Sequence, residues 1–84
     1  MEITFDDRKR RSNLVKHGYD FAELDAAFFA RSRVIEARSG RLMAIGRFDD
    51  ALISVIFRPL GTEGLAIVSM RDASTKERRL LWQN

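Results

Sequence analysis

Between residues 41 and 70 the chain repeats one pattern, in which an apolar stretch of strand length is followed by a short polar link. The links, Asp49-Asp50 and RPLGTEG, are too short for a crossover, so the stretches are expected to be antiparallel neighbours in one sheet. A further candidate strand, SRVIEA (32–37), precedes them. The three stretches are RLMAIGRF (41–48), which alternates, ALISVIF (51–57), which is apolar on both faces and expected to be central, and GLAIVSM (64–70).

Two helices are predicted before these strands. A short strand at 2–5 leads into a helix that begins after Asp6 or Asp7, either of which can cap it, and that ends at Gly18. Asp20 is expected to begin a second helix, with Glu23 completing a capping box three residues later. The side chains that this second helix would bury follow at helical spacing and are Phe21, Leu24 and Phe28.

A last helix is predicted over STKERRLLWQ (74–83), with Ser74 as its N-cap and Glu77 completing a second capping box. Leu80, Leu81 or Trp82 would anchor it. The expected order is β-α-α-β-β-β-β-α, an α+β fold. In it a curled antiparallel sheet is covered by two N-terminal helices and a C-terminal helix. No linker or repeat divides the chain, so we expect a single domain, 1–84.

Composition narrows the cellular context. The chain of 84 residues has no cysteine, which excludes disulfides and thiol chemistry and fits a reducing cytoplasm. Its longest apolar run, residues 51–57, is too short to span a bilayer, and the N-terminus is not typical of a signal peptide. We therefore expect a cytoplasmic protein without a membrane association.

The positive charge is carried mainly by arginine. The net charge is only +3, but the pI is about 10.0, because twelve arginines outnumber three lysines. The planar guanidinium group can grip a phosphate at two points, which a lysine cannot do. A basic chain of this kind favours a polyanion or an acidic protein as its partner, although many small cytosolic domains are mildly basic without such a ligand.

The segment RKRRSNLVKHGYDF (8–21) concentrates this charge. On a helix, Lys9, Asn13, Lys16 and His17 fall at i, i+4, i+7 and i+8 and share one face. Histidine is the side chain whose ordinary pKa best suits proton transfer near neutral pH. A histidine beside a terminal glycine can equally be a cap that complements the helix dipole. The segment therefore predicts either a solvated surface helix or one that faces an anion.

Two further groups of cations are candidates. Arg71 stands at the end of a predicted strand, and Lys76 and Arg78 follow on the last helix. They could form a phosphate cradle or simply pair with Asp72 and Glu77 in solvent. Arg41, Met43, Ile45 and Arg47 share one side of their strand, and Arg58 ends the next. These side chains could line one concave sheet surface together with Arg71, or only reach out to water.

The sequence lacks the motifs of several common kinds of nucleotide-binding and metal-binding site. The chain has no phosphate-binding glycine motif, and one histidine without cysteine does not make a zinc site. The paired carboxylates Asp6-Asp7 and Asp49-Asp50 occupy a helix start and a hairpin, which are their ordinary structural places. No metal and no cofactor are therefore expected.

Three segments resemble the BrnT family of bacterial type II toxins. FDDRKRRSNLVKHGYDFAE is similar to its N-terminal signature, RLMAIGRF to its arginine-rich strand, and IVSMRDASTKER to its Ile-Ser-x-Arg-x-Ala-x-x-x-Glu-Arg signature. The resemblance implies a RelE-like fold and a metal-independent ribonuclease that cleaves RNA and inhibits translation. It also implies a BrnA-type antitoxin that neutralises the toxin and binds operator DNA, and a homodimer. The family's motif residues match Lys9, Asn13, Lys16, His17, Arg47, Ser69, Arg71, Glu77 and Arg78.

With this resemblance, catalytic roles are expected for His17 and Lys16 in proton transfer and for Arg71 and Arg47 in clamping phosphate. The residues expected to bind RNA are Lys9, Asn13, Arg58, Lys76 and Arg78. Two positions depart from the family, because Ala66 stands where an arginine is common and Leu81 where a tyrosine is usual. An alternative is therefore a catalytically weak or inactive basic module that only engages an antitoxin or nucleic acid.

Overall fold

The computed structural model describes residues 1–82 and shows an α+β fold of five strands, three α-helices and a short 3₁₀ helix. The elements are β1 (Glu2–Phe5), α1 (Asp7–His17), η1 (Phe21–Glu23), α2 (Ala26–Arg31), β2 (Arg33–Glu36), β3 (Leu42–Phe48), β4 (Ala51–Leu60), β5 (Gly64–Asp72) and α3 (Thr75–Leu80). The predicted last helix extended to Gln83, which lies outside the described residues.

All five strands form one sheet in the order β1-β5-β4-β3-β2. The doubly apolar strand β4 is central, as its sequence predicted. The expectation of a purely antiparallel sheet was wrong, because β1 pairs with β5 in parallel, with Ile3 opposite Leu65. The helices and three strands lie between β1 and β5 in the chain. This long connection allows β5 to run alongside β1 in the same direction, which a short hairpin would not allow.

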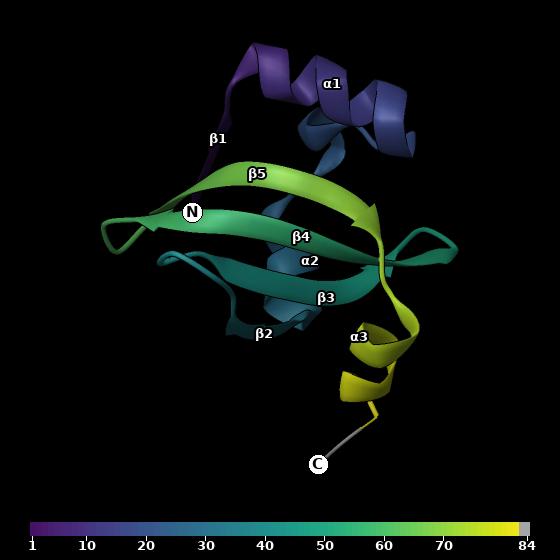
Figure 1. Ribbon diagram of the computed structural model, residues 1–84. Helices are drawn as coiled ribbons and strands as arrows, with labels where there is room; N and C mark the ends of the chain where they lie inside the picture. Colours follow the sequence, from purple (N-terminus) through teal and green to yellow (C-terminus); the bar gives the residue numbers. More distant parts are fainter. Residues whose placement is uncertain (83–84) are drawn as a thin grey trace.

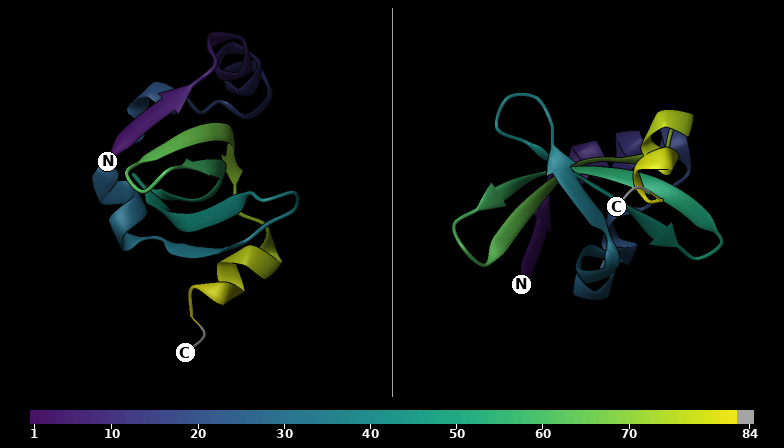
Figure 2. Two further views of the ribbon diagram at one scale, coloured as in Figure 1. Left: turned by 90° about the vertical axis from the view of Figure 1, so that its left-hand side faces the viewer. Right: turned by 90° about the horizontal axis from the view of Figure 1, so that it is seen from below.

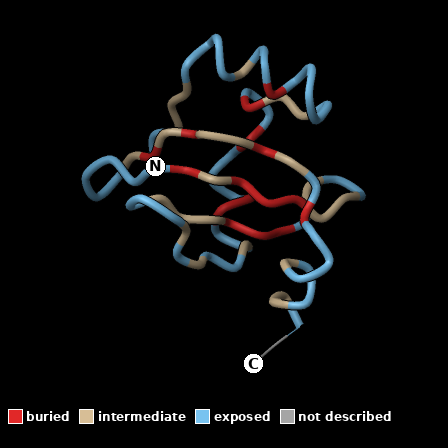
Figure 3. Tube along the Cα trace, viewed as in Figure 1, coloured by how far each residue is buried: buried red, intermediate tan, exposed pale blue. Residues whose placement is uncertain are grey.

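The two faces of the sheet are covered differently. Helix α2 lies behind the sheet in Figure 1, whereas α1 and α3 lie at opposite edges of the other face, as the left view of Figure 2 shows. The first face carries the core, in which Phe21 and Phe28 pack on β3, β4 and β5. The second face lies open between α1 and α3, which is the arrangement from which the candidate site is built. The buried residues of the core in Figure 3 follow the middle of the strands.

The predicted second helix was wrong in its extent. The chain makes one 3₁₀ turn at η1, leaves helical geometry at Leu24, and begins α2 after Asp25. Asp20 accepts a hydrogen bond from the Ala22 N–H and Asp25 from the Phe28 N–H. Each aspartate starts its own helix, so the predicted capping box between Asp20 and Glu23 is not formed and the apolar positions are shared between two short elements.

The other helix ends follow the sequence prediction. Asp6 accepts from the N–H groups of Arg8 and Lys9, and Gly18 closes α1 in the left-handed region with φ of 77°. The capping box of α3 is present, with both the Ser74 and the Glu77 side chains bonded to backbone. These ends depend on local hydrogen bonds, which is why the sequence alone predicts them.

Candidate functional site: a basic groove between α1 and β5

Helix α1 is attached to the sheet by one buried amide. Asn13 accepts a hydrogen bond from the Met70 N–H at 3.0 Å and donates to the Met70 carbonyl at 2.8 Å, so it pairs with β5 as a neighbouring strand would. Its second N–H goes to the Tyr19 carbonyl at 3.1 Å. Both of its donors are therefore engaged with backbone, and in this structure Asn13 has no N–H left for RNA. The geometry gives it the role of holding α1 beside β5.

This attachment creates a groove lined by cations and hydroxyls. One wall of the groove is formed by α1, with Lys9, Ser12, Asn13, Lys16 and His17. The other wall is formed by β5, with Val68 and Ser69. Its volume is about 200 Å³. Four of the predicted site residues, Lys9, Asn13, Lys16 and His17, are thus brought together, and among the described residues no carboxylate lines the groove. Its charge suits a phosphate group rather than a metal cation.

A second groove continues from the first along β5. It is lined by Lys9 and Val68, which both grooves share, together with Arg58 and Ala66, and has a volume of about 410 Å³. Among its described lining residues, Asp6 is the one carboxylate, and it caps α1. The predicted RNA-binding residue Arg58 therefore lies within reach of the α1 groove. A larger hollow of about 620 Å³ lies near the N-terminus, but Glu2 and Glu63 line it, and their charge would repel a polyanion.

Arg71 lies on the same strand as the groove wall, two residues after Ser69, and both side chains point to the open face of the sheet. Its guanidinium group forms a bidentate ion pair with Glu77 of α3, with Nη1 to Oε1 at 2.7 Å and Nη2 to Oε2 at 2.9 Å. Nη1 also donates to the Asp72 carbonyl. Of the five N–H groups of the side chain, Nε–H and one on Nη2 remain for another acceptor.

Glu77 is itself held by several donors. Besides Arg71, the buried hydroxyl of Ser54 donates to Oε1 at 2.8 Å, and the Ser74 N–H donates to the same atom at 2.9 Å. These hydrogen bonds, that of Arg71 first among them, lower the pKa of Glu77 to about 2, against the desolvation that would raise it. The pKa of Arg71 is raised by the same ion pair. The carboxylate therefore stays charged and keeps the guanidinium group in place.

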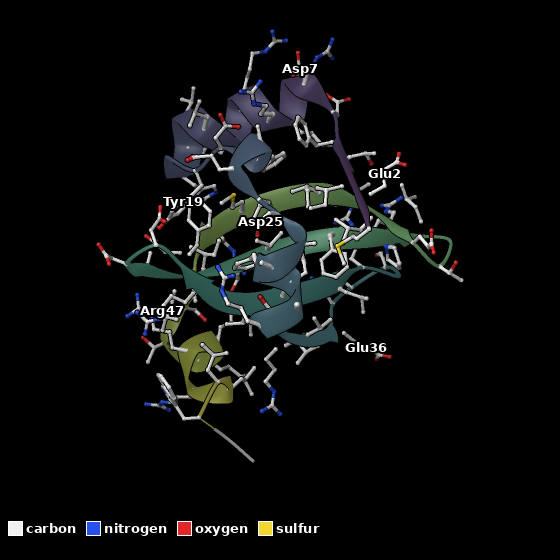
Figure 4. All side chains as sticks on the ribbon, turned by 180° about the vertical axis from the view of Figure 1, so that it is seen from behind. Glu2, Asp7, Tyr19, Asp25, Glu36 and Arg47 are labelled. Atoms are coloured by element: carbon white, nitrogen blue, oxygen red, sulfur yellow. The ribbon has the colours of Figure 1, made fainter. Side chains whose placement is uncertain are left out.

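The other predicted cations are not gathered at the α1 groove. Arg47 is exposed at the end of β3, and Figure 4 shows it beside α3, at the far side of the sheet from α1. Lys76 is exposed on α3, and Arg78 donates from Nε to the Ala73 carbonyl. These three residues belong to the α3 end of the open face, so their predicted roles would need a ligand that reaches across it.

Sequence reasoning missed two side-chain contacts near the site. The Tyr19 hydroxyl donates a short hydrogen bond to the Asp72 carboxylate, which raises the pKa of Tyr19. Ser54, wholly buried beneath Arg71 on the central strand, was not singled out either. The only available signal was that Tyr19 is the single tyrosine of the chain and that Ser54 interrupts an otherwise apolar strand.

Within residues 1–82, no three histidine, cysteine, aspartate or glutamate side chains gather as a metal-binding cluster. In the same part of the chain, no helix has both the length and the apolar character needed to cross a membrane.

Comparison with known proteins identifies the family. Residues 5–77 match the family model described as the ribonuclease toxin, BrnT, of type II toxin-antitoxin systems. The crystal structure of the Brucella abortus ribonuclease toxin, BrnT, is similar, with a TM-score of 0.83 and 47% sequence identity over 89% of this chain and 99% of the other. A search among curated proteins finds no match. Because the family model covers most of the chain and the structural match nearly all of it, the protein belongs to the BrnT family of ribonuclease toxins of type II toxin–antitoxin systems.

Proposed function

We propose that this protein is a toxin that cleaves RNA without a metal ion and thereby inhibits translation in the cytoplasm. The observation that carries the proposal is the groove that Lys9, Lys16 and His17 line together with Ser69, with no carboxylate among its described lining residues. A polyanionic backbone is the ligand that this arrangement of cations and hydroxyls favours. Family membership supports the same substrate class.

The mechanism follows from the groove. A ribose 2′-hydroxyl attacks the adjacent phosphate while a base removes its proton and an acid protonates the leaving oxygen. His17 is the candidate for one of these proton transfers, and Lys16 lies one residue away to assist either step. Arg71 would stabilise the charge that builds on phosphate, using the two N–H groups that Glu77 and Asp72 leave free. Arg47 is the more distant candidate for a clamp.

The experiment is cleavage of RNA by the purified protein in the presence of EDTA. We expect cleavage to continue in the chelator, and His17→Ala or Arg71→Ala to lower its rate by about a hundredfold, as the loss of one charge-stabilising donor does elsewhere. Arg11→Ala, an exposed cation on α1 outside the groove, is the matched control. Activity that disappears with EDTA, or that survives the double substitution of His17 and Arg71, would contradict this mechanism.

The proposal includes partners. A type II toxin is paired with an antitoxin, and we propose that a BrnA-type antitoxin binds and neutralises this chain. We propose that the complex contacts operator DNA only through the antitoxin. We also propose a homodimer and a RelE-like relationship of the fold, as the sequence resemblance implies. Copurification with the product of the neighbouring reading frame, followed by light scattering, tests the partner and the stoichiometry.

One observation favours a second candidate function. The ion pair with Glu77 engages Arg71 in the free protein, which is what a binding module without catalysis would retain to anchor α3. Expression in a bacterial host separates the two functions. A ribonuclease toxin halts growth unless the antitoxin is present, whereas a pure binding module leaves growth unchanged.

A further inference from the structure

Arg41 carries a buried hydrogen-bond donor without a partner. Its Nε atom is shielded from solvent, and within residues 1–82 no acceptor receives its N–H. Burying a donor without an acceptor costs free energy. A bound anion that the side chain turns to meet would supply the acceptor.

The surroundings of Arg41 are apolar on one side and cationic on the other. Arg41 and Arg38 line a hollow of about 310 Å³ whose remaining walls are Ala37, Met43 and Ile56. Met43 and Ile56 are direct cross-strand partners and are only partly buried, so they give the hollow an apolar floor. A floor of this kind beside two guanidinium groups suits a nucleobase with its phosphate, because a base offers an apolar face and the phosphate a negative charge.

Among the described residues, the cations of this hollow form no ion pair. Leu42 pairs with Phe57 in antiparallel register, which places Arg41 and Arg58 next to one another across the two strands. Like charges in such positions repel. Within the described residues, no carboxylate forms an ion pair with Arg38, Arg41 or Arg58, although Glu36 lines a second hollow together with Arg41.

The hollow faces the same side of the sheet as the α1 groove. Met43 lies opposite Ile56, and Ile56 lies opposite Ser69, which lines that groove. Two strand spacings separate the backbone of Met43 from that of Ser69, or about 10 Å. One strand of RNA can therefore occupy both places, with Arg58 between them.

We propose that Ala37, Arg38, Arg41, Met43 and Ile56 form a nucleotide subsite for the RNA strand whose scissile phosphate lies in the α1 groove. The base lies on Met43 and Ile56, and Arg41 and Arg38 bind the phosphate. This inference rests on the proposed function, since it names how the substrate of the same site is held.

The test uses the whole protein and a four-nucleotide 2′-O-methyl RNA, which the proposed mechanism cannot cleave because the attacking hydroxyl is blocked. Titration is followed by NMR at the Arg41 Nε–H resonance and by fluorescence anisotropy. We expect this resonance to shift on binding. Arg41→Met should weaken binding about tenfold, the loss expected for one charge-assisted contact. Arg41→Lys keeps the charge and removes the fork, so it should also weaken binding.

Arg79→Met removes an exposed cation on α3 outside the hollow and should leave the affinity unchanged. Unchanged binding in both Arg41 variants would overturn the inference, and so would an Nε–H resonance that shifts with an acidic peptide and not with RNA. In cleavage assays Arg41→Met should raise KM and leave kcat nearly unchanged. A protein that binds the oligonucleotide through Arg41 but never cleaves RNA would contradict the proposed function and leave the subsite standing.

Discussion

At the residue scale, the most informative contact is the one between Arg71 and Glu77. A guanidinium group at a strand end can swing into solvent, but here a carboxylate fixed by the Ser54 hydroxyl and the Ser74 N–H holds it. The glutamate side chain is only 15% exposed, which weakens screening by water. The Glu77 side chain therefore caps the N-terminus of α3 and also fixes the orientation of the Arg71 guanidinium group.

The low pKa of Glu77 makes this contact testable by pH. A carboxylate whose pKa falls from 4.5 to about 2 on folding stabilises the protein above pH 4.5 and loses that contribution as the pH falls towards 2. The contribution is on the order of 3 kcal/mol. We expect Glu77→Gln to lower the free energy of unfolding in urea by about this amount at pH 7 and by little at pH 2. Glu63→Gln, an exposed glutamate in the turn before β5, is the control. Equal losses at both pH values would contradict the ion pair.

At the element scale, α1 is held to the sheet by polar contacts. Val15 is 88% exposed and Leu14 43%, so the helix offers almost no apolar face. Its anchors are Asn13 on Met70 and an ion pair from Arg10 to Asp20 at 2.7 Å, which lowers the pKa of Asp20 to about 2. A helix held in this way keeps its cations at the surface, and Figure 3 shows α1 exposed along most of its length.

Removal of the Asn13 amide should therefore loosen α1. Asn13→Ala leaves the Met70 N–H and carbonyl without partners, and we expect a destabilisation of about 2–3 kcal/mol. Hydrogen exchange of the Met70 amide should accelerate strongly, whereas Arg11→Ala on the exposed side of the same helix should change neither quantity. A Met70 amide that stays protected in Asn13→Ala would show that another contact holds α1.

The contact of α2 with β3 depends on the absence of a side chain. A Cβ atom at Gly46 would lie 2.4 Å from the Ser32 Oγ and 3.3 Å from the Phe28 ring. We expect Gly46→Ala to destabilise the protein by about 1–3 kcal/mol through overpacking. Combining it with Ser32→Ala, which removes the nearest atom, should recover part of the loss. Urea unfolding of the two single variants and the double variant checks this, and strict additivity would contradict the clash.

At the scale of the whole molecule, the cations of the open face follow a path from α1 to the β2–β3 turn. Lys16 and Lys9 begin it, Arg58 continues it, and Arg41 and Arg38 end it. Lys9 lines two of the three neighbouring hollows, and each of the other four lines one of the three. The modest net charge of +3 does not reveal this arrangement. Among the described residues Asp6 is the carboxylate that lines one of these three hollows, so an extended polyanion meets a mainly positive surface.

Salt dependence should report this surface. Each phosphate contact with single-stranded nucleic acid contributes about −0.7 to the slope of log affinity against log salt concentration. We expect Lys9→Gln to reduce the magnitude of the slope for a non-cleavable RNA by about 0.7. Arg11→Gln on the opposite side of α1 should leave it unchanged. Equal slopes for the wild type and Lys9→Gln would remove Lys9 from the binding surface.

Features that depend on neighbours in the chain were determined by the sequence itself. The caps at Asp6, Gly18 and Ser74, the central position of β4 and the helical face shared by Lys9, Lys16 and His17 all follow from local hydrogen bonds and periodicity. The sequence did not predict the break between η1 and α2. Asp20 and Asp25 can each begin a helix, and the spacing of the apolar residues does not show that both of them do.

Long-range pairing was decided only by the tertiary structure. The local sequence does not determine that β1 pairs with β5 in parallel. Nor does it determine that Asn13 bonds with Met70 or that Glu77 holds Arg71 in place. A polar group that is buried loses its hydrogen bonds to water and needs a partner in the protein. Which partner is available depends on how the helices and strands pack, so the sequence alone does not predict these contacts. For the same reason Arg47, a predicted site residue by its strand position, lies beside α3 and away from the α1 groove, while Arg41 lines a separate hollow together with Arg38.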